Sequence, residues 1–187
     1  MKIPEPSTTQ AAHPDAATPD YDVHHFRRAL GQFATGVTII TTKSADGKPI
    51  GFTASSFNSV SLDPPLVLWS LDVKAGSLPA FRGNSHYAIN VLASDQIEWS
   101  RRFGAKPGDE ALDRFAGVGW REGSGGAPVL LGCCAWFECF NRSRYEEGDH
   151  IIFVGEVERC GFEPREPLIF QDGQYHMTQP HPGRKRR

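Results

Sequence analysis

A run of hydroxyl side chains lies between Gly51 and Ser70, within an apolar pattern typical of β-strands. The hydroxyl residues of this run are Thr53, Ser55, Ser56, Ser59 and Ser61. Each hydroxyl can donate and accept a hydrogen bond on a short stem, and Ala54 leaves room for a ring to approach the backbone. The run therefore suits the polar edge of a planar heterocycle, although an ordinary strand edge dotted with hydroxyls would have the same composition.

A second cluster follows directly, from Ser70 to Ser77, and includes Leu71. Gly76 frees the backbone, Ser77 can cap a short helix, and Lys74 supplies a positive charge. A hydroxyl and a cation at the start of a helix are typical of a phosphate site. An ordinary capped turn is the alternative, and the residues alone favour neither.

A third candidate is His150, which comes after the tight turn Gly148-Asp149 and begins a strand. This position would place its ring at the rim of a barrel. A lone histidine is more often structural or solvated, so a functional role for His150 is a hypothesis.

Several common site types are absent from the sequence. There is no Walker loop and no Gly-x-Ser-x-Gly elbow, and no histidine pair has the spacing of a zinc-binding helix. After Gly117-Val118-Gly119, Glu122 stands where a Rossmann loop needs its third glycine. We therefore expect no metal, and we expect any nicotinamide cofactor to bind without a Rossmann fold.

Composition limits the partners further. The chain has 187 residues and a formal net charge of −2, which argues against nucleic acid, and its one basic run, Arg184–Arg187, has the features of a solvated tail. No stretch approaches a membrane span, and the N-terminus lacks an export signal, so we expect a cytoplasmic protein.

The four cysteines, at 133, 134, 139 and 160, have no zinc or redox spacing and are expected in the core, on strands.

The chain is expected to form one domain over residues 21–178. A Pro-rich tail (1–20), expected to be disordered or draped on a neighbouring subunit, precedes this domain, and a basic tail (179–187) follows it. A helix should begin after Asp22, with Phe26, Leu30 and Phe33 on one face, and stop at Gly36. A second short helix should be capped by Ser94 or Asp95.

Strand patterns outnumber helical ones. Strands are predicted at 37–42, 50–60, 66–71, 87–91, 133–144, 150–162 and 168–170, with a hairpin at 46–49, a loop over 117–128 and a turn at Gly173. Because consecutive strands have short connections and no regular βαβ alternation, a mainly β, antiparallel barrel with a few short flanking helices is favoured over a parallel α/β sheet.

The chain resembles the flavin reductase-like family. The resemblance covers roughly Phe26 to Tyr175 and rests on the order and spacing of short motifs. These are Phe33–Thr38, Gly51–Phe57, Ser61–Val67, Tyr87–Leu92, Gly148–His150 and Pro167–Phe170, followed by Gly173 and Tyr175. One departure is Ser55, where relatives often have Asn.

This resemblance implies a Greek-key split β-barrel and a homodimer with flavin near the subunit interface. It implies flavin contacts at Thr53, Ala54, Ser55, Ser56, Ser70 and Leu71, phosphate contacts at Lys74 and Ser77, and looser contacts at Asn90 and Tyr175. It also implies that His150 acts on the nicotinamide side.

The function that follows is NAD(P)H:flavin oxidoreduction, with hydride passing from NADH or NADPH to FMN, or to FAD, and reduced flavin supplied to a separate monooxygenase. Three alternatives remain open at this point. They are a non-enzymatic flavin- or haem-binding carrier on the same barrel, a pyridoxamine-phosphate-type oxidase, and a pure interaction domain. The oxidase would need a basic pocket for a second phosphate, for which Arg142 and Arg144 are the nearest candidates.

Overall fold

The computed structural model describes residues 19–105 and 113–183. Nearly all of the predicted N-terminal tail and the basic residues 184–187 lie outside these ranges. Within them, no helix is long and apolar enough to cross a membrane.

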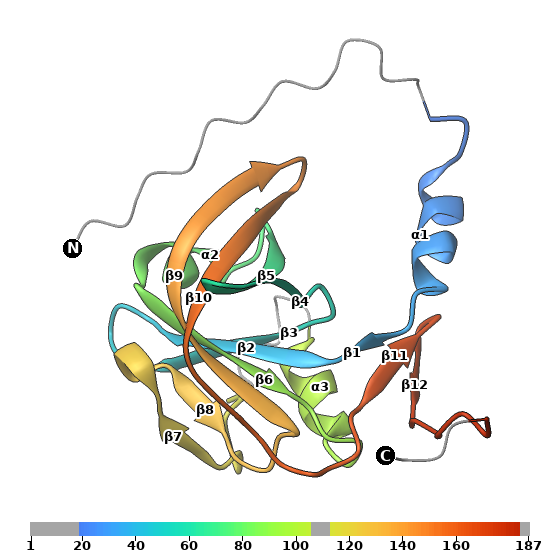
Figure 1. The fold of residues 1–187 in the computed structure, drawn as a ribbon. Helices are drawn as coiled ribbons and strands as arrows, with labels where there is room; N and C mark the ends of the chain where they lie inside the picture. Colours follow the sequence, from blue (N-terminus) through green and yellow to red (C-terminus); the bar gives the residue numbers. More distant parts are fainter. Residues whose placement is uncertain (1–18, 106–112, 184–187) are drawn as a thin grey trace.

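A single large antiparallel sheet forms the body of the molecule (Figure 1). In sheet order its seven strands are β3 (Pro49–Ala54), β2 (Thr38–Lys43), β6 (His86–Val91), β9 (Ala135–Glu147), β10 (His150–Phe162), β5 (Pro65–Asp72) and β4 (Asn58–Leu62). Every neighbouring pair runs antiparallel. The mainly β, antiparallel fold class is therefore confirmed.

The two edges of this sheet are consecutive in the chain. Between the end of β3 and the start of β4 stand only Ser55, Ser56 and Phe57. A flat sheet of seven strands would hold its edges about 29 Å apart, whereas this link spans at most about 15 Å. The sheet must therefore curl until its edges approach, and among the described residues β3 and β4 do not pair with each other. The result is a barrel split at one seam.

Smaller elements flank the barrel. Two further sheets are formed by β1 (Thr35–Gly36) with β11 (Ile169–Gln171) and β12 (Gln174–His176), and by β7 (Trp120–Glu122) with β8 (Pro128–Leu130). The helices are α1 (Val23–Gly31), α2 (Leu78–Gly83) and α3 (Ile97–Phe103), with a short 3-10 turn at Ser124–Gly126.

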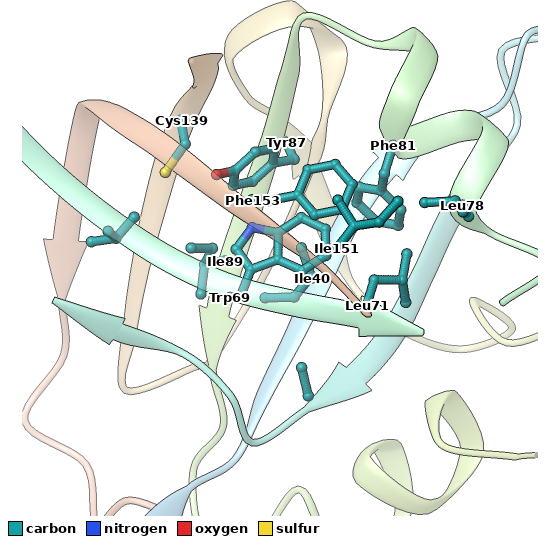
Figure 2. Close-up of a cluster of buried hydrophobic side chains, with 12 residues drawn as sticks. Ile40, Trp69, Leu71, Leu78, Phe81, Tyr87, Ile89, Cys139, Ile151 and Phe153 are labelled. Carbon is teal, nitrogen blue, oxygen red and sulfur yellow. The ribbon is translucent and has the colours of Figure 1, made fainter. Parts of the chain in front are cut away.

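An aromatic cluster fills the barrel interior (Figure 2). Trp69 from β5 and Phe153 from β10 are stacked with ring centroids 4.2 Å apart, and Phe81 from α2 and Tyr87 from β6 meet the Trp69 ring edge-on. Burial of these large side chains joins both halves of the sheet and supplies much of the apolar area that stabilises the fold.

The first helix begins where the sequence predicts, because the Asp22 carboxylate accepts a hydrogen bond from the His25 amide at 2.7 Å. It ends at Gly31, so the predicted stop at Gly36 is wrong; Gly36 belongs to β1, which pairs with β11. No residue of α1 is buried, and Figure 1 shows the helix standing away from the barrel. Its apolar residues Phe26 and Leu30 are exposed.

Other boundaries also differ from the sequence predictions. The single strand predicted over 50–60 is broken at the seam into β3 and β4, and the loop predicted over 117–128 contains β7 and the 3-10 turn. The cap of α3 is Gln96, not Ser94 or Asp95. The hairpin at 46–49 and the turn at Gly173 are confirmed, with glycine at φ +81° and +77°.

The four cysteines do not all lie in the core. Three are buried, but Cys160 on β10 is exposed, so its predicted core position is wrong. Cys133 and Cys134 precede β9, so their predicted place on a strand is also wrong. Burial raises the pKa of Cys133 to about 12 and also raises the pKa of Cys139 and Cys134.

Candidate functional site

The larger of two neighbouring cavities has a volume of about 690 Å³, within the range of small-ligand sites. It lies between β3, the segment that joins β5 to α2, and the chain on either side of the undescribed residues 106–112. Its lining includes Gly51, Phe52, Thr53, Leu71, Lys74, Ser77, Phe103, Gly104, Arg114 and Phe115. The larger cavity thus brings together four of the predicted cofactor contacts, which are Thr53, Leu71, Lys74 and Ser77.

A smaller cavity of about 240 Å³ adjoins the first. It is lined by Val37, Thr53, Ser55, Ser100, Arg101, Gly104, Phe170 and Tyr175. The two cavities share Thr53 and Gly104 as walls. They therefore form one groove with two compartments, and the predicted contacts Ser55 and Tyr175 lie in the smaller one.

Polar groups of the larger compartment are concentrated on the segment after β5. The amide of Lys74 donates to the Asp72 carboxylate at 2.7 Å, which fixes the turn, and Lys74 belongs to the lining of the cavity. Ser77 precedes α2, and its hydroxyl makes no capping hydrogen bond in the described structure. Across the cavity, Arg114 donates to the carbonyl oxygens of Ala105 at 2.9 Å and Gly51 at 3.4 Å.

The smaller compartment has an aromatic wall with a connected set of hydroxyls. The hydroxyls of Ser100 and Tyr175 lie 2.9 Å apart, and the Ser100 carbonyl accepts a hydrogen bond from the Thr53 hydroxyl at 2.7 Å. Phe170 packs beside Tyr175 with centroids 5.5 Å apart. These contacts join β3, α3 and the β11–β12 hairpin. The Thr53 hydroxyl proton is used to hold α3, while the Thr53 backbone, its methyl group and the hydroxyl lone pairs remain for a ligand.

The hydroxyl of Ser56 is also used within the protein. It accepts a hydrogen bond from the Ser70 amide at 3.0 Å and donates to the Ser70 carbonyl at 3.3 Å. Ser56 and Ser70 therefore continue the contact between β4 and β5 beyond the Asn58–Leu68 pair, next to Ser55 at the seam. Neither is among the described residues that line the two compartments.

His150 lies at the edge of the site. It pairs with Asp72 in the β5–β10 ladder, and its Nδ1 lies 2.7 Å from the Asp149 carboxylate. This hydrogen bond from His150 lowers the pKa of Asp149. The His150 side chain is 44% exposed and does not belong to the described lining of either compartment.

Asn90 has a structural position. Its side chain is fully buried, donates to the Ile39 carbonyl at 3.0 Å and to the Thr41 hydroxyl at 3.1 Å, and accepts from the Leu130 amide at 2.8 Å. These bonds use the side-chain amide of Asn90 on the side of β6 that faces β8. Nothing in the geometry supports the predicted contact between Asn90 and flavin. Ala54 is likewise buried, beside the groove wall.

Several groove residues were missed by the sequence reasoning, among them Ser100, Arg101, Gly104 and Arg114. The first three lie on α3 or directly after it, where the sequence has only the pattern of a short helix, and Arg114 follows the undescribed residues 106–112. The one available signal is Gly104 directly after Phe103, because a glycine commonly ends a helix and has no side chain to fill a neighbouring cavity. Nothing in the spacing indicated that this end faces β3.

Comparison with known proteins agrees with this architecture. Residues 30–179 match the model of the "Flavin reductase like domain" family. A "Probable flavin reductase" of Rhizobium meliloti is 47% identical over 137 residues, which are 73% of this chain but 43% of that protein. "FMN reductase (NADH) SmoA" of Agrobacterium fabrum is 45% identical over 150 residues, covering 80% of this chain and 83% of that protein.

Solved structures give the same result. Streptomyces globisporus "NADH:FAD oxidoreductase SgcE6" superposes with a TM-score of 0.78 at 37% identity, covering 90% of this chain and all of that one. The same protein "in complex with NAD and FAD fragments" gives a TM-score of 0.79 at 35% identity, covering 93% of this chain and 99% of that one. With its split antiparallel barrel and two-compartment groove, the chain belongs to the flavin reductase-like family.

Proposed function

We propose that this protein is an NAD(P)H-dependent flavin reductase that supplies reduced flavin to a separate monooxygenase. The observation that carries the proposal is the groove itself, in which a compartment with free cationic and hydroxyl groups adjoins one with an aromatic wall. The relatives support it, among them the "Flavin-dependent monooxygenase, reductase subunit HsaB" of Rhodococcus jostii, 42% identical over 161 residues.

The groove residues fit a flavin nucleotide. Lys74 and the Ser77 hydroxyl, which makes no capping hydrogen bond to α2, would hold a phosphate in the larger compartment. The backbone at Thr53 and the Ser55 side chain would meet the polar edge of the ring, and Tyr175 would pack against its apolar part. FMN matches a single such phosphate position, so we expect FMN in preference to FAD.

When bound, flavin supplies the hydride acceptor and NADH or NADPH the donor, so the protein need not supply a nucleophile. The chain's own residues bind the two partners, orient them and exclude water. The Thr53–Ser100–Tyr175 hydrogen bonds keep the groove wall rigid, which preserves that orientation. His150, which pairs with Asp72 at the edge of the larger compartment, is proposed as the residue on the nicotinamide side. His150→Ala should therefore lower turnover more than it lowers flavin affinity. Equal losses of turnover and of flavin affinity would refute this role.

A homodimer and an oxygenase partner are part of the proposal. The unburied apolar face of α1 supports a second copy, because a helix of nine residues with no buried side chain gains nothing from packing in the single chain. The two edge strands of the barrel also need cover. Free thiols at all four cysteines support a reducing, cytoplasmic location.

The decisive experiment measures anaerobic loss of NADH and NADPH absorbance with FMN, FAD or riboflavin added. A reductase consumes a pyridine nucleotide in proportion to the flavin supplied. A protein that binds flavin tightly but leaves both nucleotides intact would instead be a carrier, and one that binds no flavin would refute the proposal.

The phosphate assignment is tested separately with Lys74→Ala. We expect FMN affinity to fall about tenfold, or about 1.4 kcal/mol, with riboflavin affinity unchanged because riboflavin has no phosphate. Lys48→Ala is the matched control, since Lys48 pairs with Asp46 in the β2–β3 turn and lines neither described compartment. An equal loss for both flavins would contradict the assignment.

A further inference from the structure

One cationic side chain faces the smaller compartment. Of the described residues that line it, Arg101 is the only charged one. Its guanidinium lies over the Tyr175 ring, 5.7 Å from the centroid, and Nη1 is 2.7 Å from the Glu98 carboxylate. Neither Arg101 nor Glu98 takes part in the hydrogen bonds that hold α3 against β3 and β12, because those bonds use the Ser100 main chain and hydroxyl.

The proposed reaction creates a negative charge on the flavin ring. Hydride transfer breaks the C4–H bond of the dihydronicotinamide and forms an N–H bond on the flavin, carrying two electrons and one proton. The nicotinamide becomes a cation, and a ring that was neutral becomes anionic unless a further proton arrives. Oxidised and reduced flavin therefore differ by one charge in the same compartment, and a fixed cation there interacts more strongly with the reduced form.

We propose that Arg101 selectively stabilises the reduced, anionic flavin and thereby sets the redox balance of the site. This inference rests on the proposed function, because it places the ring in the smaller compartment. The Tyr175 face orients the guanidinium, and the Ser100–Tyr175 hydrogen bond in turn orients Tyr175.

Glu98 opposes this effect. It is three residues before Arg101 on the same helix, and both side chains are largely exposed, at 75% and 62%. An exposed pair of this kind contributes little to stability, but the carboxylate offsets part of the positive charge that the ring would meet. Removal of each partner should therefore shift the preference for reduced flavin in opposite directions.

The experiment measures the dissociation constants of oxidised and reduced riboflavin for the full chain, anaerobically, by equilibrium dialysis. Riboflavin is used because it lacks the phosphate that Arg101 would otherwise attract. For Arg101→Gln we expect the affinity ratio of reduced to oxidised flavin to fall about tenfold, which equals about 30 mV in the two-electron potential. Arg101→Lys should retain most of the ratio, and Glu98→Gln should raise it about threefold.

Arg102→Gln is the matched control. Arg102 is next in the chain, but its guanidinium donates to the Ala116 carbonyl at 2.6 Å and does not belong to the described lining of the smaller compartment. We expect its ratio to equal that of the unmodified protein. Unchanged ratios in both Arg101 variants, in a protein that still oxidises NAD(P)H, would overturn this inference and leave the proposed function intact. If the unmodified protein neither binds riboflavin nor oxidises NAD(P)H, the proposed function itself is refuted.

Discussion

The Ser56 hydroxyl bridges the amide and the carbonyl of Ser70, at 3.0 and 3.3 Å, where β3 passes into β4. One side chain thus replaces two main-chain contacts of a strand pair at the position where the barrel is split. The neighbouring Ser55 lines the smaller compartment. The hydroxyl residues of the seam therefore divide between two tasks, since Ser56 fastens the strands and Ser55 faces the cavity.

Ser56→Ala should destabilise the fold more than it weakens flavin binding. Two hydrogen bonds to the Ser70 main chain are lost, which should cost about 1–2 kcal/mol in the free energy of unfolding. Urea denaturation measures this loss, and flavin titration of the folded variant should show less than a threefold change in affinity. Ser59→Ala is the control, because Ser59 is exposed on β4. A variant of normal stability with much weaker flavin binding would mean that Ser56 contacts the ligand.

Gly155→Ala should be strongly destabilising although alanine is the smallest replacement. A Cβ at Gly155 would overlap the Tyr87 hydroxyl and stand 2.9 Å from Tyr87 Cζ and 3.0 Å from Cys139 Cβ. We expect a cost of about 1–3 kcal/mol from overpacking, measured by thermal or urea unfolding.

Two further variants test that explanation. Adding Tyr87→Phe should recover part of the loss, since it removes the overlapping hydroxyl. Gly83→Ala should be nearly neutral, because no described atom lies within 4 Å of a Cβ there. Strict additivity of Gly155→Ala and Tyr87→Phe would show that the two residues do not interact.

Stability should depend on pH through Glu138, whose side chain on β9 is 2% exposed. Burial raises the pKa of Glu138, but hydrogen bonds from Arg121 and from the Ser124 amide outweigh it, so the pKa lies below its ordinary value of 4.5. A lowered pKa in the folded state stabilises the protein above pH 4.5, and this contribution is lost as the pH falls through the folded-state value.

Glu138→Gln should therefore lower the free energy of unfolding by about 1 kcal/mol at about pH 7 and by clearly less at about pH 3. Urea midpoints at the two pH values measure the difference. Glu147→Gln, at the exposed end of β9, is the control. An equal penalty at both pH values would mean that the carboxylate charge is not what stabilises this pairing.

A thiol reagent should distinguish Cys160 from the other cysteines. Cys160 is exposed, whereas Cys133, Cys134 and Cys139 are buried and have raised pKa values, so their thiolates are scarce. A disulfide-forming chromogenic reagent should modify one thiol per chain rapidly in the native protein and all four after unfolding. Cys160→Ser should abolish the fast phase; a fast phase that survives would place an accessible thiol elsewhere.

The sequence indicated the barrel well because its strands are long and their apolar residues recur with the period of a strand. It also indicated the α1 cap, since an N-cap depends on residues within one turn. It failed where long-range contacts decide. The strand expected over 50–60 is cut at Ser55–Phe57 because the sheet curls until its two edges approach there, and no local propensity records that curvature.

The site was predictable in part for the same reason. Lys74 and Ser77 belong to one turn, so their proximity follows from the sequence, and both line the larger compartment. Arg101 and Tyr175 are far apart in the chain and meet only because α3 packs against the β11–β12 hairpin. Residue types alone could not show that the Ser56 and Asn90 side chains are already occupied by main-chain groups.

The position of α1 has a consequence for local opening. Its end is held by the hydrogen bond from the Asp172 amide to the Gly31 carbonyl at 2.9 Å, while no residue along the helix is buried. In a lone subunit its amide protons should exchange with deuterium at rates close to those of an unfolded peptide, while those of β2 and β6 remain protected. Slow exchange in α1 at high protein concentration, lost on dilution, would report directly on assembly.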